Sequence, residues 1–109
     1  MFKITFCEEE RGENQQTGKL VFKIVGDLDN TASTEAARGF EPVFKRTDCN
    51  ILIDCTELNY ISSSGLRILL NIYKHTRSNG HTITLKGLTN DVREVLSLGG
   101  FLQLFLTKD

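Results

Sequence analysis

The feature that most constrains this chain is a stretch at residues 51–70, in which an apolar run leads through three serines into a helical pattern. The run Ile51–Cys55 is short and almost continuously apolar, which suits a central strand covered on both faces. From Leu66 onwards, apolar residues recur three and four positions apart, which predicts an amphipathic helix to about Arg77. The serines at 62–64 therefore fall where a helix begins.

The remaining elements are predicted from the period of the apolar residues. Strict alternation and short apolar runs indicate strands, and spacings of three and four indicate helices. Strands are predicted at residues 2–7, 19–25, 51–55, 81–87 and 101–106. Helices are predicted at about 32–45, with a kink or restart at Pro42, and at 66–77 and 90–98. Candidate N-caps are Asn30, Thr31 or Ser33 for the first helix and Thr89 or Asn90 for the last.

The predicted order β-β-α-β-α-β-α-β places the chain in the α/β class. Strands that alternate with helices pair in parallel through crossovers, whereas the first two strands are expected to form an antiparallel hairpin around the polar residues 8–18. We expect one domain over residues 1–109, with a mixed, mostly parallel sheet and helices packed mainly on one face.

Composition excludes several classes of function. With 39% hydrophobic residues in 109 positions, a packed core is expected. The formal net charge of −1 argues against a nucleic-acid binder with a broad basic face. No run of 18 apolar residues is present, and the N-terminus lacks the continuous apolar segment of a signal peptide. We therefore expect a cytoplasmic protein that neither binds nucleic acid nor inserts into a membrane.

Enzyme, metal and cofactor motifs are missing from the sequence. The three cysteines form no C-x-x-C pair and are expected to be structural thiols, and His75 and His81 are isolated. There is no nucleophile elbow, no Walker loop and no G-x-G-x-x-G fingerprint. We expect no catalytic residues, no metal site and no cofactor. The lone carboxylate of Asp54, at a strand end, is expected to hydrogen-bond within its own loop.

Several short motifs nevertheless occur in a fixed order along the chain. They are Gly26–Asp29, Ile51–Leu58, Ser63–Leu66, Gly87, the helix at 92–98 and Leu98–Phe101. This order, over residues 18–106, resembles the STAS domain and, within it, the bacterial anti-sigma-factor antagonists. The resemblance implies a small, non-catalytic binding module. It also implies transcription regulation by partner switching with an anti-sigma factor that is an ATP-dependent serine kinase.

The same resemblance implies a site of phosphorylation. Aligned on Gly65 and Leu66, the phosphorylated position of the family falls on Ser63, with Ser64 and Ser62 as less favoured positions. The family usually has aspartate before the acceptor, and this chain has Ser62 there. Phosphorylation would block binding of the kinase, and a PP2C-type phosphatase would reset the cycle. The free protein is expected to be a monomer.

The expected partner surface surrounds these serines. Its residues are Asp27, Asp29, Asn30, Tyr60, Ile61, Ser62, Ser63, Ser64, Gly65, Leu66 and Arg67. Local chemistry alone also explains the serines as helix caps and the two aspartates as turn residues. Two other functions stay open: a non-phosphorylated STAS adaptor, such as a subunit of a transporter ATPase, and a small sensor that binds an anion or nucleotide at the helix N-terminus.

Overall fold

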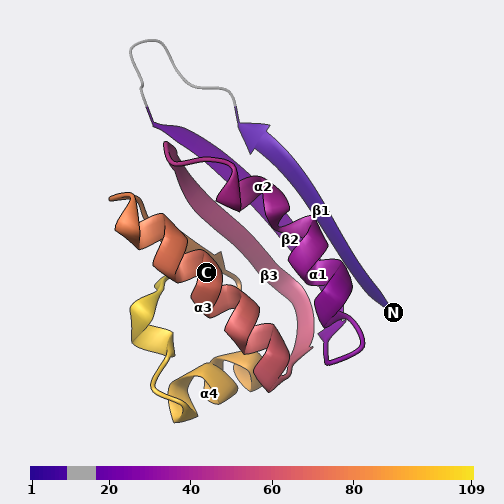
Figure 1. The fold of residues 1–109 in the computed structure, drawn as a ribbon. Coiled ribbons are helices and arrows are strands. Elements are labelled where there is room, and N and C mark those ends of the chain that lie inside the picture. Colours follow the sequence, from indigo (N-terminus) through magenta and orange to yellow (C-terminus); the bar gives the residue numbers. More distant parts are fainter. Residues whose placement is uncertain (10–16) are drawn as a thin grey trace.

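Five strands form one sheet in which spatial order follows chain order, β1-β2-β3-β4-β5 (Figure 1). The computed structural model describes residues 1–9 and 17–109. The strands are β1 (Phe2–Glu9), β2 (Gly18–Leu28), β3 (Cys49–Ile61), β4 (Ile83–Lys86) and β5 (Leu106–Lys108). The β1–β2 pair is antiparallel, and β2 to β5 are mutually parallel. The predicted α/β class and the mixed, mostly parallel sheet are confirmed.

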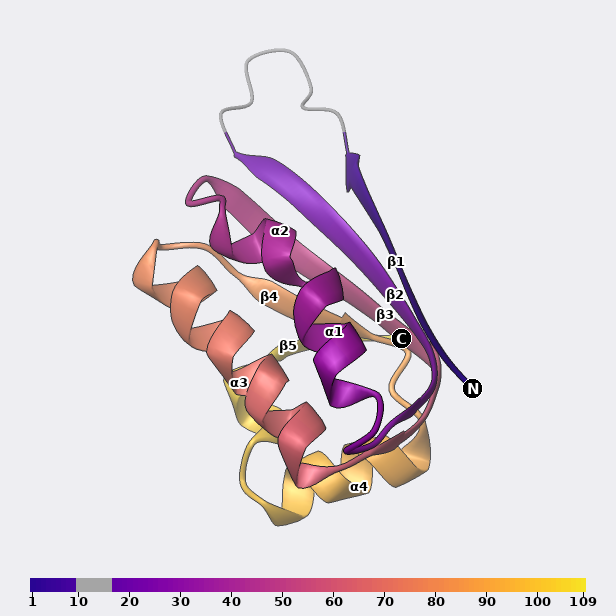
Figure 2. The same ribbon diagram turned by 45° about the vertical axis from the view of Figure 1, so that its right-hand side comes forward.

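The helices lie on one side of this sheet, as predicted (Figure 2). They are α1 (Ser33–Gly39), α2 (Glu41–Phe44), α3 (Ser63–Ser78), α4 (Asn90–Leu98) and a short 3₁₀ helix, Leu102–Leu104. Crossovers between parallel strands are right-handed, so a sheet whose order never reverses receives every crossover helix on the same face. Consequently α1 and α3 both begin at the edge where β2 and β3 end. No helix in the described part of the chain is long and apolar enough to cross a membrane.

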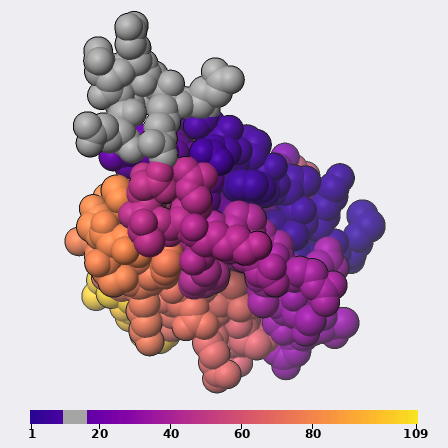
Figure 3. All heavy atoms as spheres, turned by 45° about the horizontal axis from the view of Figure 1, so that its top comes forward, coloured from indigo at the N-terminus to yellow at the C-terminus, as the bar shows by residue number. Residues whose placement is uncertain are grey.

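The core lies between the sheet and the helices. Every second residue is buried along the first part of the inner strands, for example Leu20, Phe22 and Ile24 on β2, and Ile51 and Ile53 on β3. This is the period of two that a one-sided sheet requires. In the space-filling view, α1 and α2 fill the surface between β1 and α3 (Figure 3). The opposite face of the sheet has no helical layer in Figure 2.

Both inner strands run further than predicted. β2 includes Gly26–Leu28 and β3 continues to Ile61, where the sequence suggested loops. The register between them shifts around Gly26, whose φ of +100° is a conformation that glycine adopts without strain. The extension pairs Asp27 with Tyr60. The apolar residues Leu58, Tyr60 and Ile61 predict that burial continues beyond residue 55; Leu58 and Ile61 are buried, but Tyr60 is 50% exposed.

The first predicted helix is two helices. α1 ends at Gly39 and α2 restarts with Pro42 in its first turn, which confirms the predicted restart. The predicted caps Asn30, Thr31 and Ser33 were wrong, because the N-cap position is Ala32 and its side chain forms no cap. Asp29 Oδ1 accepts a hydrogen bond of 2.9 Å from the Ala32 N–H and so holds the turn that precedes α1. Thr89 caps α4, as predicted.

The ends of the sheet also differ from expectation. The predicted last strand, 101–106, was wrong: the 3₁₀ helix occupies part of it, and Phe105 is buried with its ring 5.6 Å from that of Tyr73 before β5 begins. In β1, Phe6 stacks on Phe22 at 4.9 Å but remains 44% exposed. β1 reaches Glu9 and β2 begins at Gly18, so the connection is shorter than predicted, and its residues 10–16 lie outside the described residues.

Candidate functional site

The N-terminus of α3 is fixed by Ser62, which lies at the end of β3. A helix begins with backbone N–H groups that lack partners within the helix, and a serine at the N-cap position can supply one. Ser62 has an extended backbone, and its Oγ accepts a hydrogen bond of 3.2 Å from the Gly65 N–H. Its own N–H donates to the carbonyl oxygen of Leu28 at 2.9 Å. Ser62 therefore caps α3 and also joins it to the end of β2.

A chain of side-chain hydrogen bonds runs from this cap to the loop after β2. Ser64 Oγ donates to Asn30 Oδ1 at 2.6 Å, and Ser62 Oγ lies 2.9 Å from Ser64 Oγ. A serine hydroxyl has one proton. Because Ser64 gives its proton to Asn30, Ser62 must be the donor between the two serines. The order is thus Gly65 N–H to Ser62, Ser62 to Ser64, and Ser64 to Asn30.

Ser63 differs from both neighbours. It is the first residue of α3, it is exposed, and its hydroxyl forms no hydrogen bond with any residue that the structure describes. Ser62 is only 9% exposed and Ser64 is half-buried. Of the three candidate hydroxyls, Ser63 alone is both exposed and uncommitted.

Gly65 allows α3 to begin this close to β2. A Cβ on Gly65 would lie 2.7 Å from Leu28 Cγ and 2.8 Å from the Leu28 carbonyl oxygen. Real Cβ atoms essentially never come under 3.0 Å of another heavy atom, so any side chain would displace the helix or the strand. Gly65 is a packing residue of the site and is itself buried.

The other predicted surface residues divide into exposed and supporting ones. Asp27 and Tyr60 are exposed register partners at the ends of β2 and β3. Arg67 is exposed on the first turns of α3, and Leu66 is half-buried against the core. Ile61 is 2% exposed and therefore supports the surface from beneath.

Asp54 and Cys55 have side chains that can take part in chemistry, but Asp54 is hydrogen-bonded within its own loop and Cys55 is buried. Asp54 accepts hydrogen bonds from the Thr56 N–H and hydroxyl at 3.0 and 2.7 Å, as expected. Partial burial opposes ionisation of Asp54, but these bonds and the charges of Lys86 and Lys23 hold its pKa below the usual value. Burial raises the pKa of the Cys55 thiol to about 12. No group of three or more potential metal ligands occurs among the described residues.

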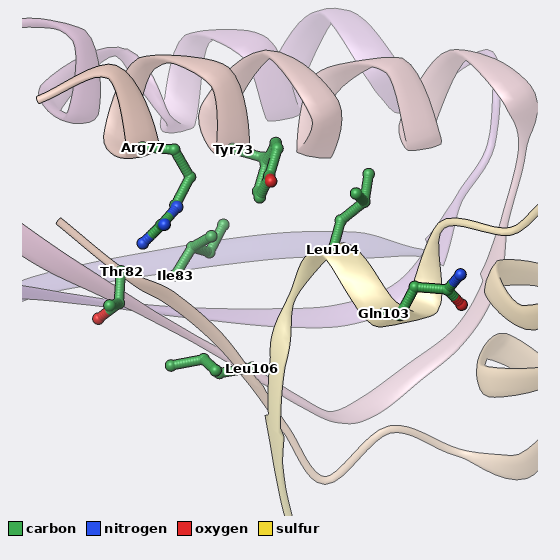
Figure 4. A pocket seen from close by; sticks show the side chains of 7 residues that line it. All are labelled: Tyr73, Arg77, Thr82, Ile83, Gln103, Leu104 and Leu106. Atoms are coloured by element: carbon green, nitrogen blue, oxygen red, sulfur yellow. The ribbon is translucent and has the colours of Figure 1, made fainter. Parts of the chain in front are cut away.

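A separate pocket of about 290 Å³ lies beside the C-terminal half of α3 (Figure 4). It is lined by Tyr73, Arg77, Thr82, Ile83, Gln103, Leu104 and Leu106. Tyr73 and Arg77 point from the helix towards β4, and the end of the Arg77 side chain lies beside Thr82 (Figure 4). Sequence reasoning identified none of these residues as functional, because they come from four separate elements and the residue before β4. Sequence reasoning also placed Asn30 on the surface without its link to Ser64, which spans 34 residues.

Similar proteins are regulators of sigma factors. The chain is 28% identical over 88 residues to BtrV of Bordetella bronchiseptica, a candidate anti-sigma factor antagonist, covering 81% of this chain and 76% of that protein. It is 24% identical over 88 residues to the anti-sigma F factor antagonist of Paenibacillus polymyxa, covering 80% and 75%.

Solved structures show the same fold. The unphosphorylated form of the anti-sigma factor antagonist SpoIIAA matches with a TM-score of 0.71 and 18% identity, covering 94% of this chain and 87% of that one. The phosphorylated form of the Bacillus protein matches with a TM-score of 0.65 and 16% identity, covering 94% and 90%. A model of the STAS domain family matches residues 12–109, nearly the whole chain. The chain therefore belongs to the STAS domain family.

Proposed function

We propose that this chain is an anti-sigma factor antagonist: a non-catalytic, monomeric and cytoplasmic module that binds an anti-sigma factor serine kinase through the start of α3. Phosphorylation of Ser63 switches the binding off. The observation that carries this proposal is the state of Ser63, whose exposed hydroxyl has no partner among the described residues. The names of BtrV and of the Paenibacillus protein support the same function.

The transfer itself is a substitution at phosphorus. Ser63 Oγ attacks the γ-phosphorus of ATP held by the kinase, the bond to the departing ADP breaks, and the hydroxyl proton passes to a base of the kinase. Ser62 carries out the capping that an aspartate would perform, but it has no charge and cannot take that proton at neutral pH.

A phosphate on Ser63 is compatible with the fold but unfavourable for binding of the kinase. The helix N-terminus favours anions, so the fold tolerates the group. A phosphoserine adds about −1.5 to −2 charges to the surface. A docked kinase would have to desolvate that dianion, and this blocks binding without a change in the fold.

The test begins with the protein recovered from cells that encode it, because its own kinase is present there. Peptide mass spectrometry should locate phosphate on Ser63, and Ser63→Ala should remove it. Ser78→Ala, at the exposed end of α3, is the control and should leave the phosphate in place. Ser63→Asp should weaken binding of the co-purifying partner more than tenfold, or about 1.4 kcal/mol.

The non-phosphorylated adaptor is the second candidate, and Ser62 in place of aspartate favours it. It predicts no phosphate on any of the three serines and a partner affinity that Ser63→Asp leaves nearly unchanged. A phosphatase of the PP2C type should release phosphate from the modified protein only if the first proposal holds.

A further inference from the structure

We propose that Asn30 is a positioning residue that selects which serine can be modified. It fixes Ser64, and through Ser64 it fixes Ser62, so that Ser63 alone presents a free hydroxyl. The consequence for modification rests on the proposed function. The hydrogen-bond arrangement itself does not, and it can be measured without a kinase.

The first step is the position of the Asn30 side chain. Its loop is held by two short hydrogen bonds: Asp29 Oδ1 accepts from the Ala32 N–H at 2.9 Å, and Ser33 Oγ donates to the Asn30 carbonyl oxygen at 2.8 Å. The strand before the loop is held by the bond between Leu28 and Ser62. Asn30 Oδ1 is therefore presented to Ser64, in the first turn of α3, from a loop that these bonds hold in place.

The second step is a count of protons. Ser62 and Ser64 together have two hydroxyl protons, and the chain that ends on Asn30 Oδ1 uses both. The Asn30 oxygen is the final acceptor, so the direction of the whole chain depends on it. Without that oxygen, the Ser64 hydroxyl keeps Ser62 Oγ, 2.9 Å away, as its one possible acceptor in the described part of the molecule, so Ser64 is held by one hydrogen bond instead of two and is freer to rotate towards solvent.

The third step is specificity. Ser63 and Ser64 are adjacent serines in the first turn of α3, and their side chains have the same chemistry. What distinguishes them is exposure and hydrogen bonding, and the second of these depends on Asn30. A kinase that meets the unaltered protein thus finds one competent hydroxyl, whereas loss of the Asn30 oxygen makes a second one available.

The matched variants are Asn30→Ala, which removes the acceptor, and Asn30→Asp, which keeps a side-chain oxygen at the same distance from the backbone. Phosphate on Ser63 and Ser64 is quantified by mass spectrometry after recovery from the native cells. We expect Asn30→Ala to raise the ratio of Ser64 to Ser63 phosphate at least tenfold. Asn30→Asp should keep the ratio of the unaltered protein. An unchanged ratio in Asn30→Ala would overturn the proposal.

A kinase-free measurement separates this inference from the proposed function. Hα–Hβ scalar couplings from NMR should show one χ1 rotamer for Ser62 and Ser64 and averaging for Ser63. In Asn30→Ala, the Ser64 couplings should become averaged, and in Asn30→Asp they should not. Averaged Ser64 couplings in the unaltered protein would refute the role of Asn30 whether or not phosphate is found. Absence of phosphate on all three serines, with the couplings as expected, would refute only the proposed function.

Discussion

The two neighbouring substitutions Ser62→Ala and Ser63→Ala make the same chemical change, but only Ser62→Ala should lower stability. Loss of an N-cap serine costs about 0.5–2 kcal/mol. Ser62 is expected near the upper half of that range, because its removal leaves the buried Gly65 N–H without an acceptor and Ser64 without its donor. We estimate that Ser62→Ala lowers the free energy of unfolding by about 1–2 kcal/mol. Ser63 is exposed and makes no such bond among the described residues, so Ser63→Ala should stay within about 0.5 kcal/mol.

Urea unfolding monitored by circular dichroism measures the difference. With a denaturant slope of about 2 kcal/mol per molar for a domain of this size, Ser62→Ala should lower the midpoint by roughly 0.5–1 M. Ser63→Ala should unfold at the midpoint of the unaltered protein. Equal midpoints for the two variants, with unchanged slopes, would show that Ser62 is not the cap and would refute the hydrogen-bond order derived above.

Three further predictions concern packing, thiols and acid stability. Gly65→Ala should destabilise the domain by up to about 2 kcal/mol in urea, because contact with Leu28 outweighs the gain of about 1 kcal/mol in helix propensity; a more stable variant would contradict the close approach. At pH 8, a thiol reagent such as DTNB should modify exposed Cys7 rapidly but Cys55 only on unfolding, since Cys55 is buried and its pKa is raised to about 12; equal rates would exclude this. Burial opposes ionisation of Asp54, yet its hydrogen bonds to Thr56 and the charges of nearby lysines lower its pKa. The ionised carboxylate therefore stabilises the fold fully above the ordinary pKa of aspartate, and this stabilisation is lost as pH falls through the lower pKa of the folded state. Asp54→Asn should therefore flatten the loss of urea stability as pH falls below about 4, the ordinary pKa of aspartate, and an equally steep loss would count against this role.

The parts of the fold that could be predicted depend on local patterns. The period of α3 is set by residues three and four apart, and the alternation of β2 is set by residues two apart, so the sequence alone indicates both. Thr89 as a cap and Pro42 as a restart are equally local signals.

The missed features depend on contacts between distant residues. Tyr60 is exposed between the buried Leu58 and Ile61, and this spacing of three departs from strand alternation at the register shift with β2, which only the pairing of the two strands reveals. The link from Ser64 to Asn30 has no sequence signal, since serine and asparagine occur in many turns. The last strand was misplaced because residues 101–106 are apolar except for Gln103, as in a buried strand, yet Leu102–Leu104 form a 3₁₀ helix and β5 begins only at Leu106.

The bond between Asn30 and Ser64 joins residues on either side of the β2–β3 crossover. Long-range contacts form late in folding, because the chain loses entropy in closing the intervening segment before the contact can repay it. A chain that is still unfolded, or still emerging from the ribosome, therefore has the serines but not the arrangement that distinguishes them. An enzyme that recognises this arrangement recognises only the folded protein. The abundance of Ser63 modification would therefore report on the fraction of the protein in which the parallel sheet is complete.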